Sequence, residues 1–319
     1  MQQANFKQLE KLQERFDSET SQGLSAIKIG DFLAKELPRR ELLLAPVLPR
    51  QGLVLIHGPR GIAKTFVALN IAYAIVSGGS YLKWKAPEPR GVLYLDGEMP
   101  APVLQERCAS IVQASAKTPE ADLLIVTPDL NRGYGMPDLS TEDGQTAIDA
   151  LVTDGIELII VDNLSCLCRT GKENEAESWL AVQTWALRHR AAGRSVLFVH
   201  HTGKNGLQRG TSRREDVLDT VLGLRWPHDY DATEGARFEC HIEKGRGIFG
   251  DDAEPFEARL ELDEKGQQVW STKYLTASRR EKIKEMANEG LKDREIAEIL
   301  GIDRSTVYRN RKAAQQEGG

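Results

Sequence analysis

The sequence predicts a wound α/β domain followed by a small helical module. Three observations support this fold class. From Leu53 onward, short apolar runs alternate with longer amphipathic stretches. The runs are rich in β-branched residues and lack polar alternation, as in strands buried on both faces of a parallel sheet. The pattern then changes to strands without long helices after Asp216, and to short helices from about Thr276.

The α/β part has five expected parallel strands with helix-length stretches between them, which is the pattern of a wound sheet. The strands are expected at 53–57, 92–96, 123–127, 158–162 and 195–200. The helices are expected at 64–78, 101–116, 141–154 and 174–192. The later strands predict an antiparallel extension on one sheet edge, with members at 220–226, 237–244, 256–262 and 267–272.

Composition limits the classes of partner. The chain has 319 residues, a net charge of -5 and a pI of about 5.8, so any contact with DNA must be local. It has no apolar run of roughly 18 residues and no hydrophobic signal core at the N-terminus. We therefore expect a soluble cytoplasmic protein that does not contact membranes. The four cysteines lack paired spacing and are expected to be reduced, without a metal.

Three domains are expected: an N-terminal helix or arm at 1–23, a large α/β domain at 24–272 and a small helical module at 273–319. In the first, apolar residues at helical spacing predict one amphipathic helix. These residues are Phe6, Leu9, Leu12 and Phe16. The helix is interpreted either as a frayed terminus or as an arm that docks on a neighbouring subunit.

The stretch directly after the first strand has the Walker A pattern in its required context of strand, glycine-rich loop and helix. It consists of Gly58, Pro59, Arg60, Gly61, Ile62, Ala63, Lys64 and Thr65. Backbone N–H groups and the helix N-terminus are expected to hold the phosphates of ATP, Lys64 to neutralise the β- and γ-phosphates, and Thr65 to bind Mg²⁺. Ala63 replaces a glycine of the pattern, and its Cβ is expected to narrow the loop or to strain its dihedral angles.

Two carboxylates complete the predicted nucleotide site. Asp162 ends the strand at 158–162 and is expected to hold Mg²⁺ through water, as a Walker B residue does. Glu98 follows the strand at 92–96, at the sheet edge where α/β proteins bind ligands. We expect it to polarise the water that attacks the γ-phosphate. The alternative for Asp162 is an aspartate that caps the end of the strand. The alternative for Glu98 is a solvated acid in a loop.

The order of these motifs carries a resemblance to a family. Walker A, then LDGEM, then Walker B, then FVHHTGK is similar to the RecA-like hexameric ATPases, particularly the RepA-type helicases of plasmids and mobile elements. The resemblance covers about residues 40–250. It implies that His200 or His201, at the end of the strand after Walker B, senses the γ-phosphate, and it leaves open which of the two does so.

The same resemblance assigns a role to Lys244 and Arg246. They look like the Lys-x-Arg element with which helicases of this group reach into the next subunit's nucleotide site. Such a cation stabilises transition-state charge in trans, which implies a homo-oligomer, a closed ring of six. The alternative is a basic hairpin turn on the surface.

Two loops of the α/β domain are candidate DNA contacts. The loop at 203–214 has no acid and is expected to bind the backbone of single strands. Its cations are Lys204, Arg209, Arg213 and Arg214. A solvated loop or a subunit contact is the alternative. The weaker candidate is the loop after Walker B, where acidic residues offset the cations.

The C-terminal module resembles a helix-turn-helix of the resolvase type, with Gly301 at the turn and Asp303 or Ser305 as the cap of its third helix. From Lys273 onward the chain carries 11 Lys and Arg against 8 Asp and Glu, a net charge of +3, whereas the remainder carries -8. The residues expected near base edges or phosphates of duplex DNA are Arg304, Ser305, Thr306, Tyr308, Arg309, Arg311 and Lys312. A module that binds protein instead is the alternative.

The favoured function is therefore a ring-forming, Mg-ATP-dependent ATPase that acts on DNA, a replicative helicase of a plasmid or integrated element. One alternative is a DNA-bound regulator or partition-like factor in which ATP switches assembly without unwinding. A P-loop kinase of small molecules is the other; it is disfavoured because no arginine-rich lid follows the sheet and the helix-turn-helix would be unexplained.

Overall fold

The computed structural model divides the chain into two units, Met1–Arg40 and Glu41–Gly319. It describes residues 26–37, 40–133, 135–169, 175–202, 216–300 and 302–316. In the first unit, the described part contains one short helix, α2 (Ile29–Ala34), whose residues are all exposed. The expected helix within residues 1–23 lies outside the described residues. The domain boundaries expected from the sequence stay predictions.

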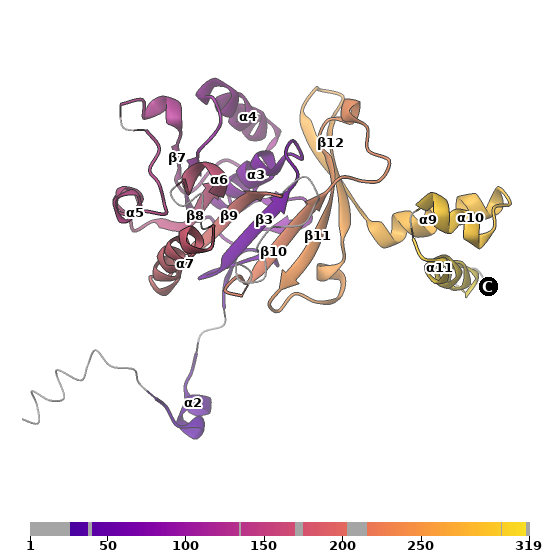
Figure 1. The fold of residues 1–319 in the computed structure, drawn as a ribbon, viewed down its shortest axis with the longest axis horizontal. Helices are drawn as coiled ribbons and strands as arrows, with labels where there is room; N and C mark the ends of the chain where they lie inside the picture. The colour runs from indigo at the N-terminus through magenta and orange to yellow at the C-terminus, as the bar shows by residue number, and fades with distance from the viewer. Residues whose placement is uncertain are drawn as a thin grey trace, which may run out of the picture. The chain divides into compact units, whose positions relative to one another are not determined.

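The second unit is built on a nine-stranded sheet in the order β13-β12-β11-β10-β3-β9-β8-β6-β7 (Figure 1). Six neighbouring strands are parallel: β3 (Leu53–Gly58), β6 (Gly91–Asp96), β7 (Leu123–Val126), β8 (Ile156–Asp162), β9 (Ser195–His201) and β10 (Thr220–Arg225). Three antiparallel strands extend one edge: β11 (Arg237–Gly245), β12 (Phe256–Leu262) and β13 (Gln268–Tyr274). The predicted α/β class, a mostly parallel sheet with an antiparallel edge, is confirmed.

One strand assignment was wrong. β10 was expected in the antiparallel extension, but it pairs in parallel with β3, with Thr220 opposite Val54. The chain between β9 and β10 is long enough for the crossover connection that parallel strands need. Its sequence has no helical pattern from which a crossover could have been predicted. The antiparallel extension therefore begins one strand later, at β11.

Helices cover both faces of the parallel sheet, so side chains alternate between two cores (Figure 1). Ile160, for example, faces the core of the first pair of helices, whereas Ile159 faces the other core. The first face packs against α3 (Lys64–Val76) and α4 (Ala101–Ala114). The other packs against α5 (Glu142–Asp149), α6 (Leu164–Leu167) and α7 (Glu175–Ala191). All four predicted helices of this part are present.

Several short elements were not expected from the sequence. Two small hairpins are formed by β1 (Leu42–Leu44) with β2 (Leu48–Pro49) and by β4 (Ser80–Tyr81) with β5 (Trp84–Lys85). The described residues also form single turns of 3₁₀ helix, which are η2 (Pro128–Leu130), η3 (Ala232–Glu234) and η4 (Gly250–Ala253). Segments of two to four residues are too short for hydrophobic periodicity to reveal them.

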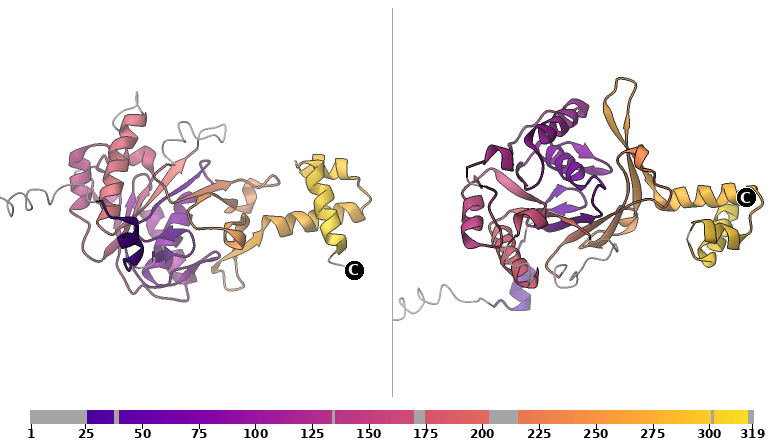
Figure 2. Two further views of the ribbon diagram at one scale, coloured as in Figure 1. Left: turned by 90° about the horizontal axis from the view of Figure 1, so that it is seen from below. Right: turned by 45° about the horizontal axis from the view of Figure 1, so that its top comes forward.

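The C-terminal module consists of three helices that follow β13 directly (Figure 2). They are α9 (Leu275–Asn288), α10 (Asp293–Leu300) and α11 (Arg304–Gln316). A separate core is buried between them, formed by Ile283, Ile296, Ala297 and Val307. Asp303 caps α11, because its carboxylate accepts a hydrogen bond from the Ser305 backbone at 2.7 Å. The open choice between these two capping residues is thus decided for Asp303.

Candidate nucleotide site

The glycine-rich loop lies between the carboxyl end of β3 and the first turn of α3. Gly58 is required by close packing, since a Cβ there would lie 2.7 Å from the Leu224 carbonyl oxygen. Gly61 has φ +83° and Ala63 has φ +71°. Left-handed backbone suits glycine but is strained for alanine. The structure therefore supports the second expectation for Ala63, strained dihedral angles.

Replacing Ala63 by Gly is expected to raise the free energy of unfolding by about 1 kcal/mol, because the Cβ penalty at positive φ disappears. Urea unfolding of the nucleotide-free protein measures it. Ala68, in the middle of α3, is the matched control, since glycine in a helix destabilises by about 1 kcal/mol. Equal destabilisation by both substitutions would contradict strain at Ala63.

Lys64 is buried at the start of α3, and its ammonium group points back into the loop. Nζ donates hydrogen bonds to the carbonyl oxygens of Gly58 at 2.8 Å and Pro59 at 2.6 Å. Burial lowers the pKa of Lys64 to about 8, whereas the charges of Asp162 and Glu98 act to raise it. The ammonium group thus lies inside the loop, with the two predicted carboxylates near enough to influence it.

Asp162 lies at the carboxyl end of β8 and is 2% exposed. The Tyr94 hydroxyl donates to its Oδ2 at 2.6 Å, and Thr65 forms a second side-chain hydrogen bond with it. Burial raises the pKa of Asp162 to about 6, against the effect of these hydrogen bonds. The structure therefore brings Thr65 and Asp162 together. One hydroxyl and one carboxylate suit Mg²⁺, which binds few protein oxygens and keeps waters and phosphate oxygens as ligands.

Glu98 follows β6, whose last residue, Asp96, pairs with Asp162 of β8. Its side chain is 60% exposed, and its Oε2 accepts a 2.7 Å hydrogen bond from the side chain of Asn163. Nε2 of His201 lies 3.6 Å from the same oxygen. His200, the preceding residue of β9, points to the other face because side chains alternate along a strand. Of the two candidate sensors, the geometry favours His201.

Sequence reasoning missed three residues of this site. Asn163 contacts both Glu98 and His201, and Tyr94 bonds to Asp162. Asp96 accepts hydrogen bonds from the backbone of Glu98 and Met99, which shapes the turn that carries the carboxylate. For Asn163 a signal existed, because a polar residue directly after a Walker B aspartate must lie at the same sheet edge. Tyr94 gave no signal, because it lies within an apolar strand.

Lys244 and Arg246 lie at the other end of the sheet. Gly245, between them, pairs with Thr220, which pairs with Val54 near the start of β3. The four steps from there to Gly58 span roughly 13 Å. Lys244 Nζ lies 3.5 Å from the carbonyl oxygen of Asp216. The Arg246 guanidinium donates to the same oxygen at 2.9 Å and lies 3.8 Å from the buried Asp219 carboxylate. These two cations are not brought to the phosphate loop of their own chain.

The predicted DNA contacts fall into two groups. Lys204, Arg209, Arg213 and Arg214 lie outside the described residues, as does the side chain of Lys312. On α11, the side chains that are exposed are Arg304, Ser305, Tyr308 and Arg309. Thr306 is half-buried, and Arg311 forms an ion pair with Asp293 at 2.5 Å. Arg311 therefore has a partner within the module, at the start of α10.

Two families match the chain. The profile of the AAA domain family matches residues 18–207, more than half of the chain and the whole of the nucleotide site. The chain belongs to the AAA domain family. The profile of a homeodomain-like domain matches residues 274–319, which include all three helices of the C-terminal module.

Two solved structures are similar to parts of the chain. The flagellar accessory protein FlaH from Methanocaldococcus jannaschii is 12% identical, with 70% of this chain and 90% of that chain covered and a TM-score of 0.45. The RadB recombinase is 15% identical, with 68% of this chain and 90% of that chain covered and a TM-score of 0.43. No curated protein matches the chain.

Family membership and the sheet order together identify this AAA domain as a nucleotide-dependent P-loop ATPase with the predicted RecA-like fold. The Walker A loop lies inside the matched range, at the carboxyl end of the parallel strands. The C-terminal module of the same chain is a helix-turn-helix. Within the described residues, no helix is both long and apolar enough to cross a membrane.

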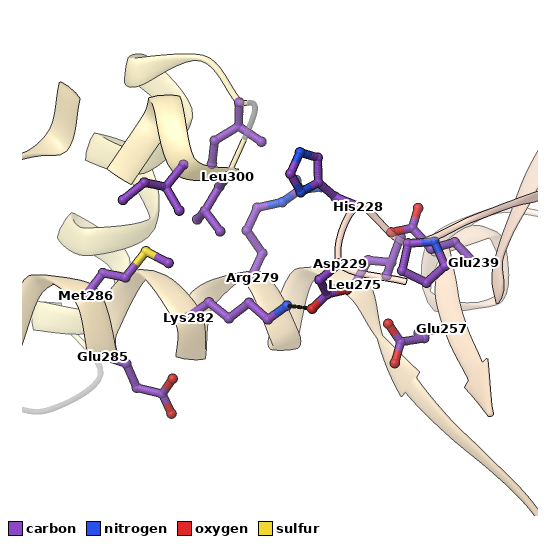
Figure 3. Close-up of a pocket in the computed structure, with 13 residues that line it drawn as sticks. His228, Asp229, Glu239, Glu257, Leu275, Arg279, Lys282, Glu285, Met286 and Leu300 are labelled. Carbon is purple, nitrogen blue, oxygen red and sulfur yellow. Dashed lines mark hydrogen bonds and ion pairs between the residues drawn. The ribbon is translucent and has the colours of Figure 1, made fainter. Parts of the chain in front are cut away.

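A separate pocket of about 500 Å³ lies between the antiparallel strands and α9 and α10 (Figure 3). Lys282 of α9 reaches across to Asp229, with 2.9 Å between Nζ and Oδ2. Its walls combine apolar side chains such as Met286 with acids of both sides such as Glu257 and Glu285. None of the nucleotide-site residues lines it, so this pocket is distinct from the nucleotide site.

Proposed function

We propose that this AAA domain protein is a Mg-ATP-dependent ring ATPase that acts on DNA, a replicative helicase of the RepA type from a plasmid or integrated element. The observation that carries the proposal is the convergence of Lys64, Thr65, Asp162 and Glu98 at one edge of the sheet. Charge neutralisation, a metal ligand set and a candidate base are adjacent there.

Each of these residues has a distinct task in hydrolysis. Lys64 and the loop backbone bind the phosphates, and Thr65 with Asp162 holds Mg²⁺. When bound, Mg²⁺ neutralises charge that develops on the β- and γ-phosphates. Glu98 orients the attacking water and accepts its proton. His201, 3.6 Å from Glu98, is the sensor of the γ-phosphate.

The position of Arg246 supports a site that is completed between subunits. Because it lies at the opposite end of β3 from the phosphate loop, it cannot complete the site of its own chain without a large rearrangement. Lys244 and Arg246 would instead enter the site of the next subunit, replacing their present contacts with Asp216. Heterologous contacts of this kind form a ring when the rotation between subunits closes, and a closed ring of six is proposed here.

DNA is assigned to two surfaces. The loop at 203–214 is proposed, from its charge alone, to bind single strands through their phosphates. The exposed face of α11 is proposed to read duplex DNA through Arg304, Ser305 and Arg309. Arg311 would contribute only if it exchanged its ion pair with Asp293 for a phosphate.

Deleting residues 276–319 is expected to abolish duplex binding while single-strand-stimulated ATPase persists, because the module has its own core. In the full chain, the double substitution R304A/R309A should weaken duplex binding at least tenfold and reduce the log-log salt slope by up to about 2. Fluorescence anisotropy at two salt concentrations measures both. R294A, an exposed arginine of α10 outside the reading helix, is the matched control.

The assays also separate the alternatives. Strand displacement on a forked duplex is expected of a helicase. ATPase activity without displacement would favour an ATP-switched regulator, and ATPase activity indifferent to single-stranded DNA would remove the role on DNA. Duplex binding that survives the deletion would make the module a protein-binding domain.

A further inference from the structure

Asn163 is a residue that neither motif accounts for. It follows the Walker B aspartate directly, is 2% exposed and is the N-cap of α6. Its Oδ1 accepts a 3.2 Å hydrogen bond from the backbone N–H of Cys166. That bond fixes the orientation of the amide, because an N–H needs an oxygen as its acceptor.

With Oδ1 committed to the cap, Nδ2 faces the nucleotide site with two hydrogens. One is donated to Oε2 of Glu98 at 2.7 Å. Nδ2 also lies 3.1 Å from Nε2 of His201. An amide nitrogen donates and does not accept, so Nε2 must be the acceptor and the His201 ring is neutral. Burial, which lowers the pKa of His201, acts in the same direction.

Glu98 depends on this bond for its position. Its carboxylate is 60% exposed, and its other contacts among the described residues are longer, 3.6 Å to His201 and 3.9 Å to the Cys166 sulfur. A glutamate has three rotatable side-chain bonds, whereas a general base must be held within roughly 0.5 Å of its working position. The Asn163 amide is the short, directional contact that can do this.

We propose that Asn163 is a positioning residue for ATP hydrolysis. One hydrogen of its amide orients Glu98, and the other hydrogen-bonds to His201. The inference rests on the proposed function. In the step, a water oxygen bonds to the γ-phosphorus as the bond from that phosphorus to the bridging oxygen of ADP breaks, and Glu98 accepts the water proton. Asn163 neither gains nor loses a proton. A movement of His201 would therefore be transmitted to Glu98 through the side chain of Asn163.

The test separates positioning from capping. Ser and Asp are good N-caps, so N163S and N163D can keep the bond from Cys166, but neither supplies an N–H to Glu98. Both are expected to lower kcat about 10- to 100-fold, with the KM for ATP and the affinity for ADP within about twofold of the wild type. Wild-type turnover in N163S and N163D, with loss only in N163A, would show that Asn163 is a cap alone.

A second cap provides the matched control. Thr141 caps α5 by accepting a hydrogen bond from Gly144. T141A should lower the thermal midpoint and leave kcat unchanged. For the link to His201, H201Q keeps a side-chain acceptor for the amide, so it should retain more activity than H201A. Equal activity of H201A and the wild type would remove His201 from the relay.

The double variant E98Q/N163S, compared with the single variants, distinguishes the positioning role of Asn163 from the proposed function, in which Glu98 is the base. If Asn163 acts through Glu98, adding N163S to E98Q should change kcat less than twofold, whereas independent action would multiply the two losses. Full turnover in E98Q alone would overturn Glu98 as the base and hence the proposed function. An inactive E98Q with a fully active N163S would overturn only the relay.

Discussion

Glu98→Gln is expected to lower ATP turnover by about 10² to 10⁴ while ATP still binds, whereas Lys64→Ala is expected to lose ATP binding itself. The difference follows from where each charge lies. The ammonium of Lys64 is inside the loop, 2.8 Å from the carbonyl oxygen of Gly58, where the phosphates are proposed to bind. Glu98 lies outside the loop, with a largely exposed carboxylate, and has little to contribute to ground-state affinity.

Equilibrium binding of a fluorescent ATP analogue and steady-state phosphate release measure these two quantities. Glutamine keeps the size of Glu98 and can still accept the hydrogen bond from Asn163, so the site should stay intact. Glu106, an exposed residue of α4, offers a matched control, since E106Q removes one carboxylate away from the site. Equal loss of nucleotide affinity in the Glu98 and Lys64 variants would count against Glu98 as the base.

The sequence predicted this region well because the signals are local. The apolar run at 158–162 and the glycine-rich loop at 58–65 each indicate an element and its end without knowledge of the rest of the chain. Parallel strands share one carboxyl edge, so the strand ends alone predict that Asp162 and Glu98 lie close together. The three C-terminal helices were predicted for the same reason, from short periodic segments around the turn at Gly301.

What the sequence could not predict depends on pairing across distance. Whether β10 runs parallel or antiparallel depends on the neighbouring strand to which it hydrogen-bonds. The hydrophobic pattern of a six-residue strand does not indicate which of the two occurs. Hydrogen bonds such as Tyr94 to Asp162 and the ion pair of Arg311 with Asp293 join residues from different elements. Nor could strand patterns reveal that Arg246 lies at the opposite end of β3 from Gly58, because that follows from the register of β11 on β10.

That last position carries the prediction with the largest effect. Arg246→Ala is expected to lower ATP hydrolysis by about 10³ to 10⁵, because an arginine delivered in trans stabilises charge in the transition state. Loss of its ion pair with Asp219 is a competing explanation, since that carboxylate is buried and also accepts a hydrogen bond from the Leu53 backbone. Unfolding measurements on R246A separate the two, because damage to the sheet would lower stability along with activity.

Mixing inactive variants tests whether the arginine acts between subunits. In mixed rings of R246A and E98Q chains, an R246A chain supplies an intact Glu98 and its E98Q neighbour supplies an intact Arg246. Roughly a quarter of the junctions in an equal random mixture are then complete, so part of the ATPase rate should return.

Mixtures of E98Q with K64A are the control, because both lesions lie in the same half of the site and no junction is complete. Native mass spectrometry with a non-hydrolysable ATP analogue must show co-assembly. If co-assembled R246A and E98Q chains stay inactive, Arg246 does not act across the junction, and the site is completed within one chain.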